Sequence, residues 1–420
     1  MEKKIMRIGI MGLIRGRIFV DQFKNMENVK VTAVCENSQR SLENIRQTLQ
    51  EDKTIQVFNN FDDFINSGLM DAVMLCNYFT EHAAYAIRAM EKGIHVLSEC
   101  TPALTMAECV ALCRTVEKTG CKYMLSENYP FFACNMEMKR RYDTGNLGRA
   151  LFCEGEYNHP IAPDHWNRMS PGKYHWRNWL PRSYYITHSL APVLYITGNN
   201  IKAVNCKSVF APETLKGTAC RVGDLMSIML CEMEDGSLAR VTGCSAWGGE
   251  GNWYRICGEY GSMESVRGDI QKVRIQYNDW QIPEGEEKVN VVEARWHEDE
   301  EMNNRPGEAG HGGGDYWVAY YFMKYVTEDI EPFFNVYRSV SMSAAAILAL
   351  RSSQENGKEY RIPDFTKEEE RKLWENDTGN PFPDENGVAT MPCCSHPDYM
   401  PTEEDIANAE KDWRKAGHII

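Results

Sequence analysis

The feature that most constrains this chain is the alternation of apolar β-type runs with helical segments in its N-terminal part. A run at Arg7–Met11 is followed by a glycine-bearing turn and then by an apolar-periodic stretch that begins near Phe19. Strands that alternate with helices in this way pair in parallel, so the sequence predicts a doubly wound parallel α/β sheet. The further strands are expected at Val29–Cys35, Asp71–Cys76, His95–Ser98 and Lys122–Leu125.

Beyond Pro130 the strand-like runs follow one another, which predicts an α+β domain with a large, mainly antiparallel open sheet. These runs are Ala150–Tyr157, Ala203–Phe210, Leu225–Glu232, Ser237–Ser245, Tyr254–Gly258 and Lys272–Gln276. The aperiodic stretch 158–181 is expected to be an ordered site loop. Because 420 residues exceed what one core usually holds, we expect a first domain over 1–130, a second over 131–356, and a C-terminal extension over 357–420 with a short final helix.

Composition narrows the classes of partner. The net charge of -14 and the lack of a basic run argue against nucleic acid. The N-terminus resembles no signal peptide and no stretch is long enough to span a bilayer, so a cytoplasmic protein without membrane contact is expected. The 15 cysteines form no disulfide framework and are expected to be reduced. Cys393, Cys394 and His396 suggest fragments of a metal site, but a fourth ligand is missing and an ordinary loop is favoured, so no metal is expected.

The first strand-to-helix turn carries the cofactor signal. Gly12 and Gly16 let the backbone approach a pyrophosphate that the helix N-terminus holds, while Ile14 takes the place of the usual middle glycine and Arg15 completes the turn. Glu36 ends the second strand, where a carboxylate accepts hydrogen bonds from ribose hydroxyls and repels a 2′-phosphate. The pattern predicts an NAD-binding Rossmann domain. The alternative is that the glycines serve turn geometry alone and that Glu36 is an exposed strand-end residue.

Two later stretches, Cys76–His82 and Gly93–Glu99, resemble the Gfo/Idh/MocA oxidoreductases. The resemblance implies that Asn77, His82 and Glu99 lie at the cofactor. It also implies a lysine after the glutamate that assists proton transfer, but this chain reads Glu99-Cys100-Thr101-Pro102 and lacks it. Cys100 is possible as a nucleophile, and a small packing residue is the favoured interpretation, since nothing nearby in sequence indicates a lowered thiol pKa.

Without that lysine, oxidation of a hydroxyl needs another base, and histidine and tyrosine are the natural candidates. Tyr185 and His188 are three residues apart and share one face of a helical turn. The common family pattern also has a histidine here, with a partner aspartate four residues earlier, where this chain has Tyr184. A structural histidine is the alternative.

Around these residues the chain is similar to the NAD-dependent α-N-acetylgalactosaminidase branch of the superfamily. The similarity rests on Tyr185, Thr187, His188, Leu190 and Pro192, and on the stretches Glu154–His159 and His311–Asp315. It implies an NAD that oxidises sugar C3, so that C2–H becomes acidic and the aglycone is eliminated. By that resemblance Tyr185 and His188 serve C3 oxidation, Tyr157 is the C2 base and Asn128 faces the nicotinamide.

The expected substrate residues are His159, Trp176, Tyr184, His311 and Asp315. Several have structural alternatives. Three tryptophans either stack on a sugar or serve as packing anchors: Trp166, Trp176 and Trp179. The segment 311–315 either contacts the substrate or is only a flexible glycine turn.

The sequence thus predicts an NAD(H)-dependent, carbohydrate-active oxidoreductase that oxidises a ring hydroxyl of a sugar or glycoside, with cleavage by elimination as the further possibility. Two alternatives remain at this point. One is a simple sugar dehydrogenase or 3-keto-glycoside reductase that exchanges free NAD(H), and the other is a non-catalytic sugar or nucleotide sensor. A small-molecule sugar or glycoside is the expected ligand, and assembly into a homo-oligomer is expected.

Overall fold

The chain forms two compact units, which we describe separately. The computed structural model describes residues 5–210, 220–244, 248–307, 309–384 and 386–418. Unit 1 comprises Met1–Met136, Arg295–Ser343 and Asp364–Asn376. Unit 2 comprises Glu137–Ala294, Ala344–Pro363 and Asp377–Ile420.

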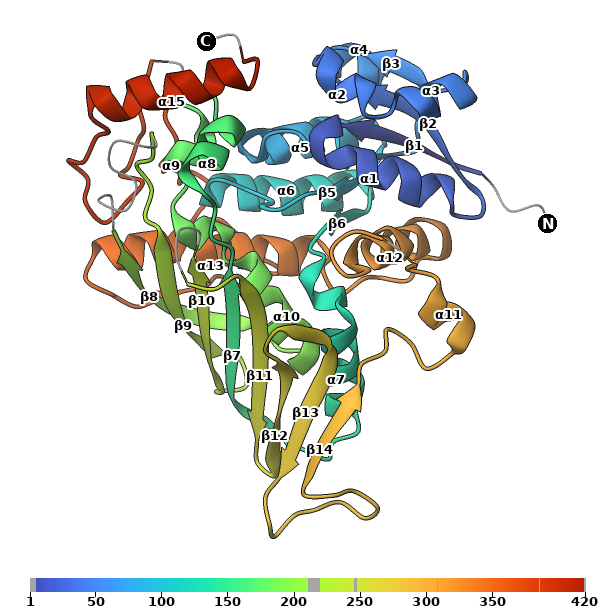
Figure 1. Ribbon diagram of the computed structural model, residues 1–420, viewed down its shortest axis with the longest axis vertical. Coiled ribbons are helices and arrows are strands. Elements are labelled where there is room, and N and C mark those ends of the chain that lie inside the picture. Colours follow the sequence, from blue (N-terminus) through green and yellow to red (C-terminus); the bar gives the residue numbers. More distant parts are fainter. Residues whose placement is uncertain (1–4, 211–219, 245–247, 308, 385, 419–420) are drawn as a thin grey trace. The chain divides into compact units, whose positions relative to one another are not determined.

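Unit 1 contains a six-stranded parallel sheet with the strand order β3-β2-β1-β4-β5-β6 (Figure 1). The predicted doubly wound fold is confirmed. The sequence patterns missed β3, whose three residues are exposed or only partly buried and therefore give no apolar run. The strands are β1 (Met6–Met11), β2 (Val29–Cys35), β3 (Gln56–Phe58), β4 (Ala72–Leu75), β5 (His95–Ser98) and β6 (Tyr123–Leu125).

The helices of unit 1 connect these strands and add a C-terminal contribution, because α12 packs against α1 and against the turn after β6. They include α1 (Leu13–Lys24), α2 (Gln39–Glu43), α3 (Arg46–Glu51), α4 (Phe61–Asn66), η1 (Phe79–Glu81), α5 (His82–Glu91), α6 (Met106–Thr119), η2 (Tyr129–Phe131), α11 (Glu300–Asn304), α12 (Gly314–Glu328) and α14 (Glu368–Arg371). Two helices cross the unit boundaries, α7 (Ala133–Asp143) and α13 (Val336–Gln354).

Unit 2 contains a nine-stranded sheet with the order β14-β13-β12-β11-β7-β10-β9-β8-β15, whose β13–β14 edge is visible in Figure 1. Its described pairs are antiparallel apart from β7 with β10, which confirms the predicted mainly antiparallel sheet. The predicted run over 237–245 corresponds to β10, and Ser245 lies outside the described residues. The strands are β7 (Ala150–Asn158), β8 (Ile201–Val209), β9 (Met226–Met233), β10 (Leu238–Cys244), β11 (Gly251–Gly258), β12 (Gly261–Val266), β13 (Asp269–Tyr277), β14 (Val289–Glu293) and β15 (Tyr360–Arg361).

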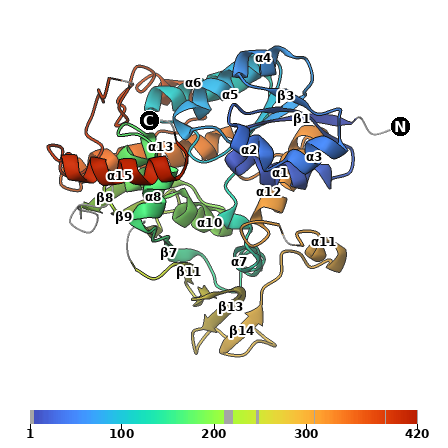
Figure 2. The same ribbon diagram turned by 45° about the horizontal axis from the view of Figure 1, so that its top comes forward.

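The stretch 158–181, predicted as an aperiodic loop, contains two short helices, α8 (Pro163–Met169) and α9 (Trp176–Trp179). Each is too short to show a helical period, which is why the prediction missed them. The expected final helix exists as α15 (Glu403–Lys415) and begins with a capping box at Thr402. It lies beside α8 (Figure 2), where Asn167 donates a hydrogen bond to Asp412 at 2.9 Å.

The remaining helical elements of unit 2, η3 (Arg182–Tyr185) and α10 (Thr187–Thr197), carry the candidate catalytic residues. Helix α10 packs directly on β7. At their closest point a Cβ added to Gly155 would lie 1.9 Å from the carbonyl oxygen of Ser189, so only a glycine fits there.

None of the helices that the structure describes combines the length and the apolar character needed to cross a membrane. The described cysteine side chains form no disulfide with one another, and most of them are buried.

The contact of Gly155 predicts a large effect from a small substitution. Gly155→Ala should lower the free energy of unfolding by about 2–4 kcal/mol, because α10 must move off β7 to admit the methyl group. Gly249→Ala is the matched control, since a Cβ there has nothing within 4 Å. Denaturant unfolding measures both. Equal stability of the two variants would contradict the close approach.

Candidate active site

The glycine turn of unit 1 lies between β1 and α1. Gly12 has φ +81, and a Cβ on it would lie 2.5 Å from the carbonyl oxygen of Cys76, so glycine is required. Gly12, the N-cap residue of α1, has no side chain to cap the helix, and Glu36 accepts only the N–H of Leu13, so the N–H groups of Ile14 and Arg15 remain available to an anion. The turn therefore fits a pyrophosphate. Ile14, in the position of the usual middle glycine, is 74% exposed on this turn.

Gly16 lies where α1 approaches β1, and its predicted approach to phosphate stays a prediction. It is buried in α1, and a Cβ on it would lie 2.7 Å from Cγ2 of Ile10. Its lack of a side chain lets α1 pack closely on β1.

Glu36 reaches the same turn from the end of β2. Its carboxylate accepts hydrogen bonds from the backbone N–H groups of Leu13, Asn37 and Ser38, each at 2.9 Å. Since a carboxylate has about four acceptor sites, capacity for a ribose hydroxyl remains. The position of Glu36 beside the N-terminus of α1 agrees with the predicted ribose contact, which stays a prediction.

His82 joins the loops that follow β4 and β5. Its ring nitrogens lie 3.1 Å from the carbonyl oxygen of Thr101 and 3.2 Å from that of Asn77. Burial lowers the pKa of His82 to about 4, so the ring is neutral. Both nitrogens contact the chain itself, which supports a positioning role for His82, and its predicted cofactor contact stays a prediction. Asn77 contacts Glu81 through its amide nitrogen at 3.2 Å.

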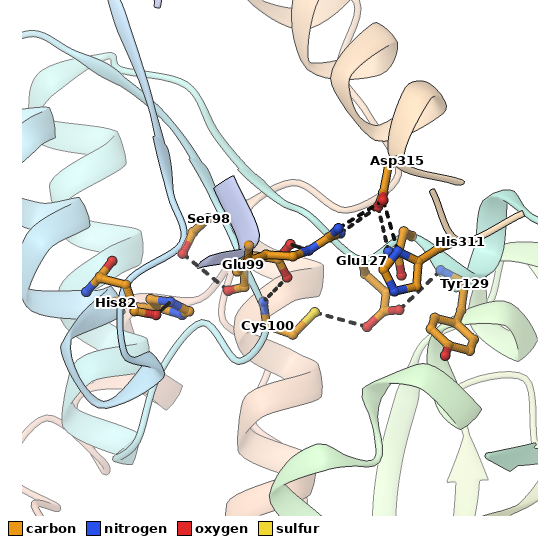
Figure 3. Close-up of polar contacts among 11 residues, drawn as sticks. His82, Ser98, Glu99, Cys100, Glu127, Tyr129, His311 and Asp315 are labelled. Carbon is orange, nitrogen blue, oxygen red and sulfur yellow. Dashed lines mark hydrogen bonds and ion pairs between the residues drawn. The ribbon is translucent and has the colours of Figure 1, made fainter. Parts of the chain in front are cut away.

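Arg15, Glu99, Asn128, His311 and Asp315 form one network of polar contacts, which we call the Arg15 cluster (Figure 3). Arg15 donates to Glu99 at 2.8 Å and to both oxygens of Asp315 at 2.9 and 2.5 Å. Asn128 donates to Asp315 at 2.8 Å, and Nδ1 of His311 lies 2.9 Å from it. Residues predicted separately for cofactor and for substrate therefore meet at one carboxylate.

The electrostatics of this carboxylate follow from its contacts. Burial by itself would raise the pKa of Asp315, but the hydrogen bonds from Arg15 and His311 outweigh burial and hold the pKa well below its usual value. The side chain of Asp315 is fully buried, and its oxygens are occupied by protein donors. These contacts support a positioning role for Asp315, and its predicted substrate contact stays a prediction. With Nδ1 of His311 held by Asp315, Nε2 remains for other partners.

The turn before α12 is built by close approach. A Cβ on Gly314 would lie 2.4 Å from the carbonyl oxygen of Asn128, and one on Gly313 would lie 2.8 Å from the ring of Trp296. The glycines that the sequence suggested as a flexible turn thus allow the N-terminus of α12 to contact the end of β6.

Cys100 and Glu127 form a buried pair at the ends of β5 and β6. The thiol donates to Glu127 at 3.1 Å, and the backbone N–H of Tyr129 donates to the other oxygen at 3.3 Å. Both side chains are buried, in agreement with Cys100 as a packing residue. Sequence reasoning missed Glu127. Its position directly after a buried parallel strand was the available signal.

In unit 2 the three predicted catalytic residues lie together. The ring centroids of Tyr157 and Tyr185 lie 4.9 and 5.0 Å from that of His188, both edge-on. The guanidinium of Arg182 lies 5.3 Å from the ring centroids of both tyrosines. We call these four residues the Tyr157 cluster. Tyr254 fixes the start of α10 by donating to the carbonyl oxygen of His188 at 2.8 Å.

The other predicted substrate residues of unit 2 differ in their surroundings. His159 is partly exposed and pairs with Glu250 at 3.2 Å. Trp176 is partly buried beside Arg177, whose guanidinium lies 4.3 Å from its ring. Tyr184 is fully buried against Phe382 and packs in the core, and its predicted substrate role stays a prediction.

Trp166 and Trp179 are packing anchors. The indole N–H of Trp166 donates to Asn178, and that of Trp179 donates to the carbonyl oxygen of Lys173, each at 3.0 Å. Both side chains are buried.

Two families match parts of the chain. Residues 5–127 match the family GFO_IDH_MocA, described as an oxidoreductase family with an NAD-binding Rossmann fold. Residues 270–372 match the C-terminal domain of glycosyl hydrolase 109. The predicted cofactor, NAD, is confirmed by the first match.

The chain is also similar to curated proteins. A glycosyl hydrolase family 109 protein of Streptomyces niveus is 25% identical over 400 residues, covering 88% of this chain and 79% of that protein. An α-N-acetylgalactosaminidase of Shewanella oneidensis is 26% identical over 205 residues, covering 46% of this chain and 44% of that protein. The match to a family 109 protein of Phocaeicola vulgatus, 26% identical, covers 45% of this chain and 49% of that protein. The chain thus spans less than half the length of the latter two relatives.

Solved structures share the fold. Levoglucosan dehydrogenase in complex with NADH superposes with a TM-score of 0.71 at 16% identity, covering 86% of this chain and 99% of that one. An oxidoreductase from Agrobacterium radiobacter in complex with NAD+, L-tartaric acid and magnesium gives a TM-score of 0.68 at 13% identity, covering 86% and 99%.

Removing the charge of Asp315 should destabilise unit 1. We expect Asp315→Asn to lower the free energy of unfolding by about 3 kcal/mol or more at pH 7, because Arg15 loses a buried partner. Since folding lowers the pKa of Asp315, its contribution is present above the unfolded pKa of about 4 and is lost as the pH falls further. Denaturant unfolding at a series of pH values measures this.

The control for Asp315 is Asp62→Asn, since Asp62 is an exposed partner of Arg88. This substitution should lower the free energy of unfolding by less than about 1 kcal/mol at every pH. If the difference in the free energy of unfolding between the two variants did not shrink below pH 4, the ionised carboxylate of Asp315 would not be the origin of the effect.

We expect the charge of Glu36 to favour NAD over NADP. Glu36→Ser should narrow the preference for NAD over NADP by about tenfold, or ~1.4 kcal/mol, because the repulsion of the 2′-phosphate is removed. Calorimetry with both dinucleotides measures the ratio, with Glu51→Ser as an exposed acidic control. Equal binding of NAD and NADP by the unaltered protein would make the ribose assignment wrong.

Proposed function

We propose that this chain, which carries the NAD-binding domain of the Gfo/Idh/MocA oxidoreductase family and the C-terminal domain of glycosyl hydrolase 109, oxidises a ring hydroxyl of a sugar or glycoside. The hydroxyl is the one at C3, and the oxidation is the redox step of glycoside cleavage by elimination. The observation that carries the proposal is the Tyr157 cluster, where two tyrosines and a histidine meet in one unit.

The chemistry requires one base for a hydroxyl proton and another for a carbon acid. His188 and Tyr185, neighbours at the start of α10, supply the first and accept the proton of the C3 hydroxyl. A bound NAD, which the glycine turn at Gly12 and Glu36 would hold, would supply the reversible hydride transfer at C3.

The second base acts on the oxidised sugar. A ketone at C3 makes C2–H acidic, and Tyr157 on the neighbouring strand β7 removes that proton. The electron pair forms the C1–C2 double bond, and the aglycone leaves C1 with its bonding electrons and takes a proton. Water then adds its oxygen to C1 and a proton returns to C2, so the net reaction is hydrolysis without consumption of NAD.

A simple sugar dehydrogenase is the second candidate function. It is favoured by the fold that this chain shares with levoglucosan dehydrogenase. The two differ in stoichiometry. A dehydrogenase forms one NADH for each sugar oxidised, whereas elimination cleaves glycosides with bound NAD and no net NADH.

We also propose that the chain assembles with copies of itself. The outward face of the sheet in unit 2 exposes Ile228, Leu230 and Leu238, which are 37%, 43% and 41% exposed. Native mass spectrometry followed by denaturation reports the assembly mass and whether NAD co-purifies.

The elimination mechanism has its own test. Transfer of deuterium from solvent to C2 of the sugar is measured across a panel of glycosides.

His188 is the residue on which this function is tested. His188→Ala should keep bound NAD and near-normal folding but lose about two to four orders of magnitude in sugar oxidation, the range of positioned general bases. Tyr185→Phe should lose less. Transient NADH absorbance measures the step. Turnover by His188→Ala at the rate of the unaltered protein would remove His188 from the mechanism, and the absence of NADH, C2 exchange and product in the unaltered protein would favour a sensor.

A further inference from the structure

The guanidinium of Arg182 is a buried cation without a counter-ion among the described residues. Its side chain is 4% exposed, and the structure records no ion pair for it. Its Nε and Nη2 atoms are buried without a hydrogen-bond partner in the part of the chain that the structure describes. Because a guanidinium stays charged in proteins, an unpaired one is costly to bury and indicates a partner that arrives from outside.

The two unpartnered atoms belong to one edge of the guanidinium. The N–H bonds of Nε and Nη2 point in the same direction and form a parallel pair of donors. A carboxylate offers two acceptor oxygens that match this spacing, which is the bidentate geometry typical of arginine–carboxylate pairs.

The neighbours of Arg182 enclose this edge without giving its two nitrogens a hydrogen-bond partner among the described residues. The faces of Tyr157 and Tyr185 lie 5.3 Å from the guanidinium carbon and stabilise its charge without using the N–H groups. Gly243 of β10 is the register partner of Tyr157, and a Cβ on it would lie 3.6 Å from Nε. A larger residue at 243 would therefore cover the donor edge.

We propose that Arg182 binds the carboxylate of an acidic sugar, so that the substrate class is a uronic acid or its glycoside. This inference rests on the proposed function. Arg182 lies against the same tyrosines that we assign to C2 and C3, so a carboxylate held there fixes the sugar ring beside Tyr157, Tyr185 and His188. The neutral sugars lack the group that pairs with the buried charge.

Binding to the full chain, with NAD present, tests the proposal independently of turnover. Calorimetry compares glucuronate with glucose, and galacturonate with galactose. We expect at least one acid to bind about ten- to a hundredfold more tightly than its neutral counterpart, the range for a charge-assisted bidentate pair. Arg182→Gln should abolish the difference, whereas Arg414→Gln, on the exposed face of α15, should preserve it.

Thermal stability separates a ligand site from a structural role. Arg182→Gln without ligand should melt at the same temperature as the unaltered protein or higher, because a buried unpaired charge is removed. A clear fall in melting temperature together with an unchanged preference for the acid would make Arg182 structural and overturn the proposal. Gly243→Val, which retains Arg182 and covers its edge, should also lose the preference.

Other outcomes are decisive as well. Equal binding of acidic and neutral sugars by the unaltered protein overturns the proposal, as does a preference for glucose 6-phosphate or N-acetylgalactosamine over both uronates. Uronate binding without C2 exchange or NADH would leave this site intact while the proposed function fails. Turnover of neutral glycosides without a uronate preference would support the proposed function and overturn the carboxylate site at Arg182.

Discussion

The buried carboxylate of Asp315 is the group on which the arrangement of the unit 1 site depends. It accepts hydrogen bonds from Arg15 in the first turn of α1, from Asn128 after β6 and from His311 before α12. A carboxylate with no exposed surface requires such donors, since an unpaired charge in this position is strongly unfavourable. Three segments distant in sequence are thereby tied to one point, and one of them is the glycine turn that we expect to approach the cofactor.

Close contacts between backbone segments also fix the positions of the site residues. Gly12 lies against Cys76, and Gly314 lies against Asn128. Gly155 of unit 2 lies against Ser189 in the same way. Each contact admits no Cβ, and each adjoins residues assigned to the chemistry. Close packing of this kind positions side chains better than long polar contacts do, because a shift of one atom is resisted by the backbone itself.

Arg15 and Arg182 illustrate how pairing decides the role of a charge. Arg15 is neutralised by Glu99 and Asp315, so its charge serves the internal structure of unit 1. Arg182 lies against the rings of two tyrosines, and two of its nitrogens have no hydrogen-bond partner among the described residues, which is why we propose that it binds a ligand. The residue type is the same, and the difference lies in the neighbours that each fold supplies.

The sequence by itself determined the class of fold and the cofactor. Alternating strands and helices indicate a parallel sheet, and Gly12 with Glu36 indicates a dinucleotide turn, because these signals are local and periodic. The spacing of Tyr185 and His188 likewise predicted a shared face, and they are neighbours in the structure. What only the tertiary structure decided are the contacts between distant segments: the burial of Tyr184 and Asp315, the pair of Cys100 with Glu127, and the unpaired edge of Arg182. No periodicity encodes which side chain meets which after folding, and burial and hydrogen bonding depend on those neighbours alone.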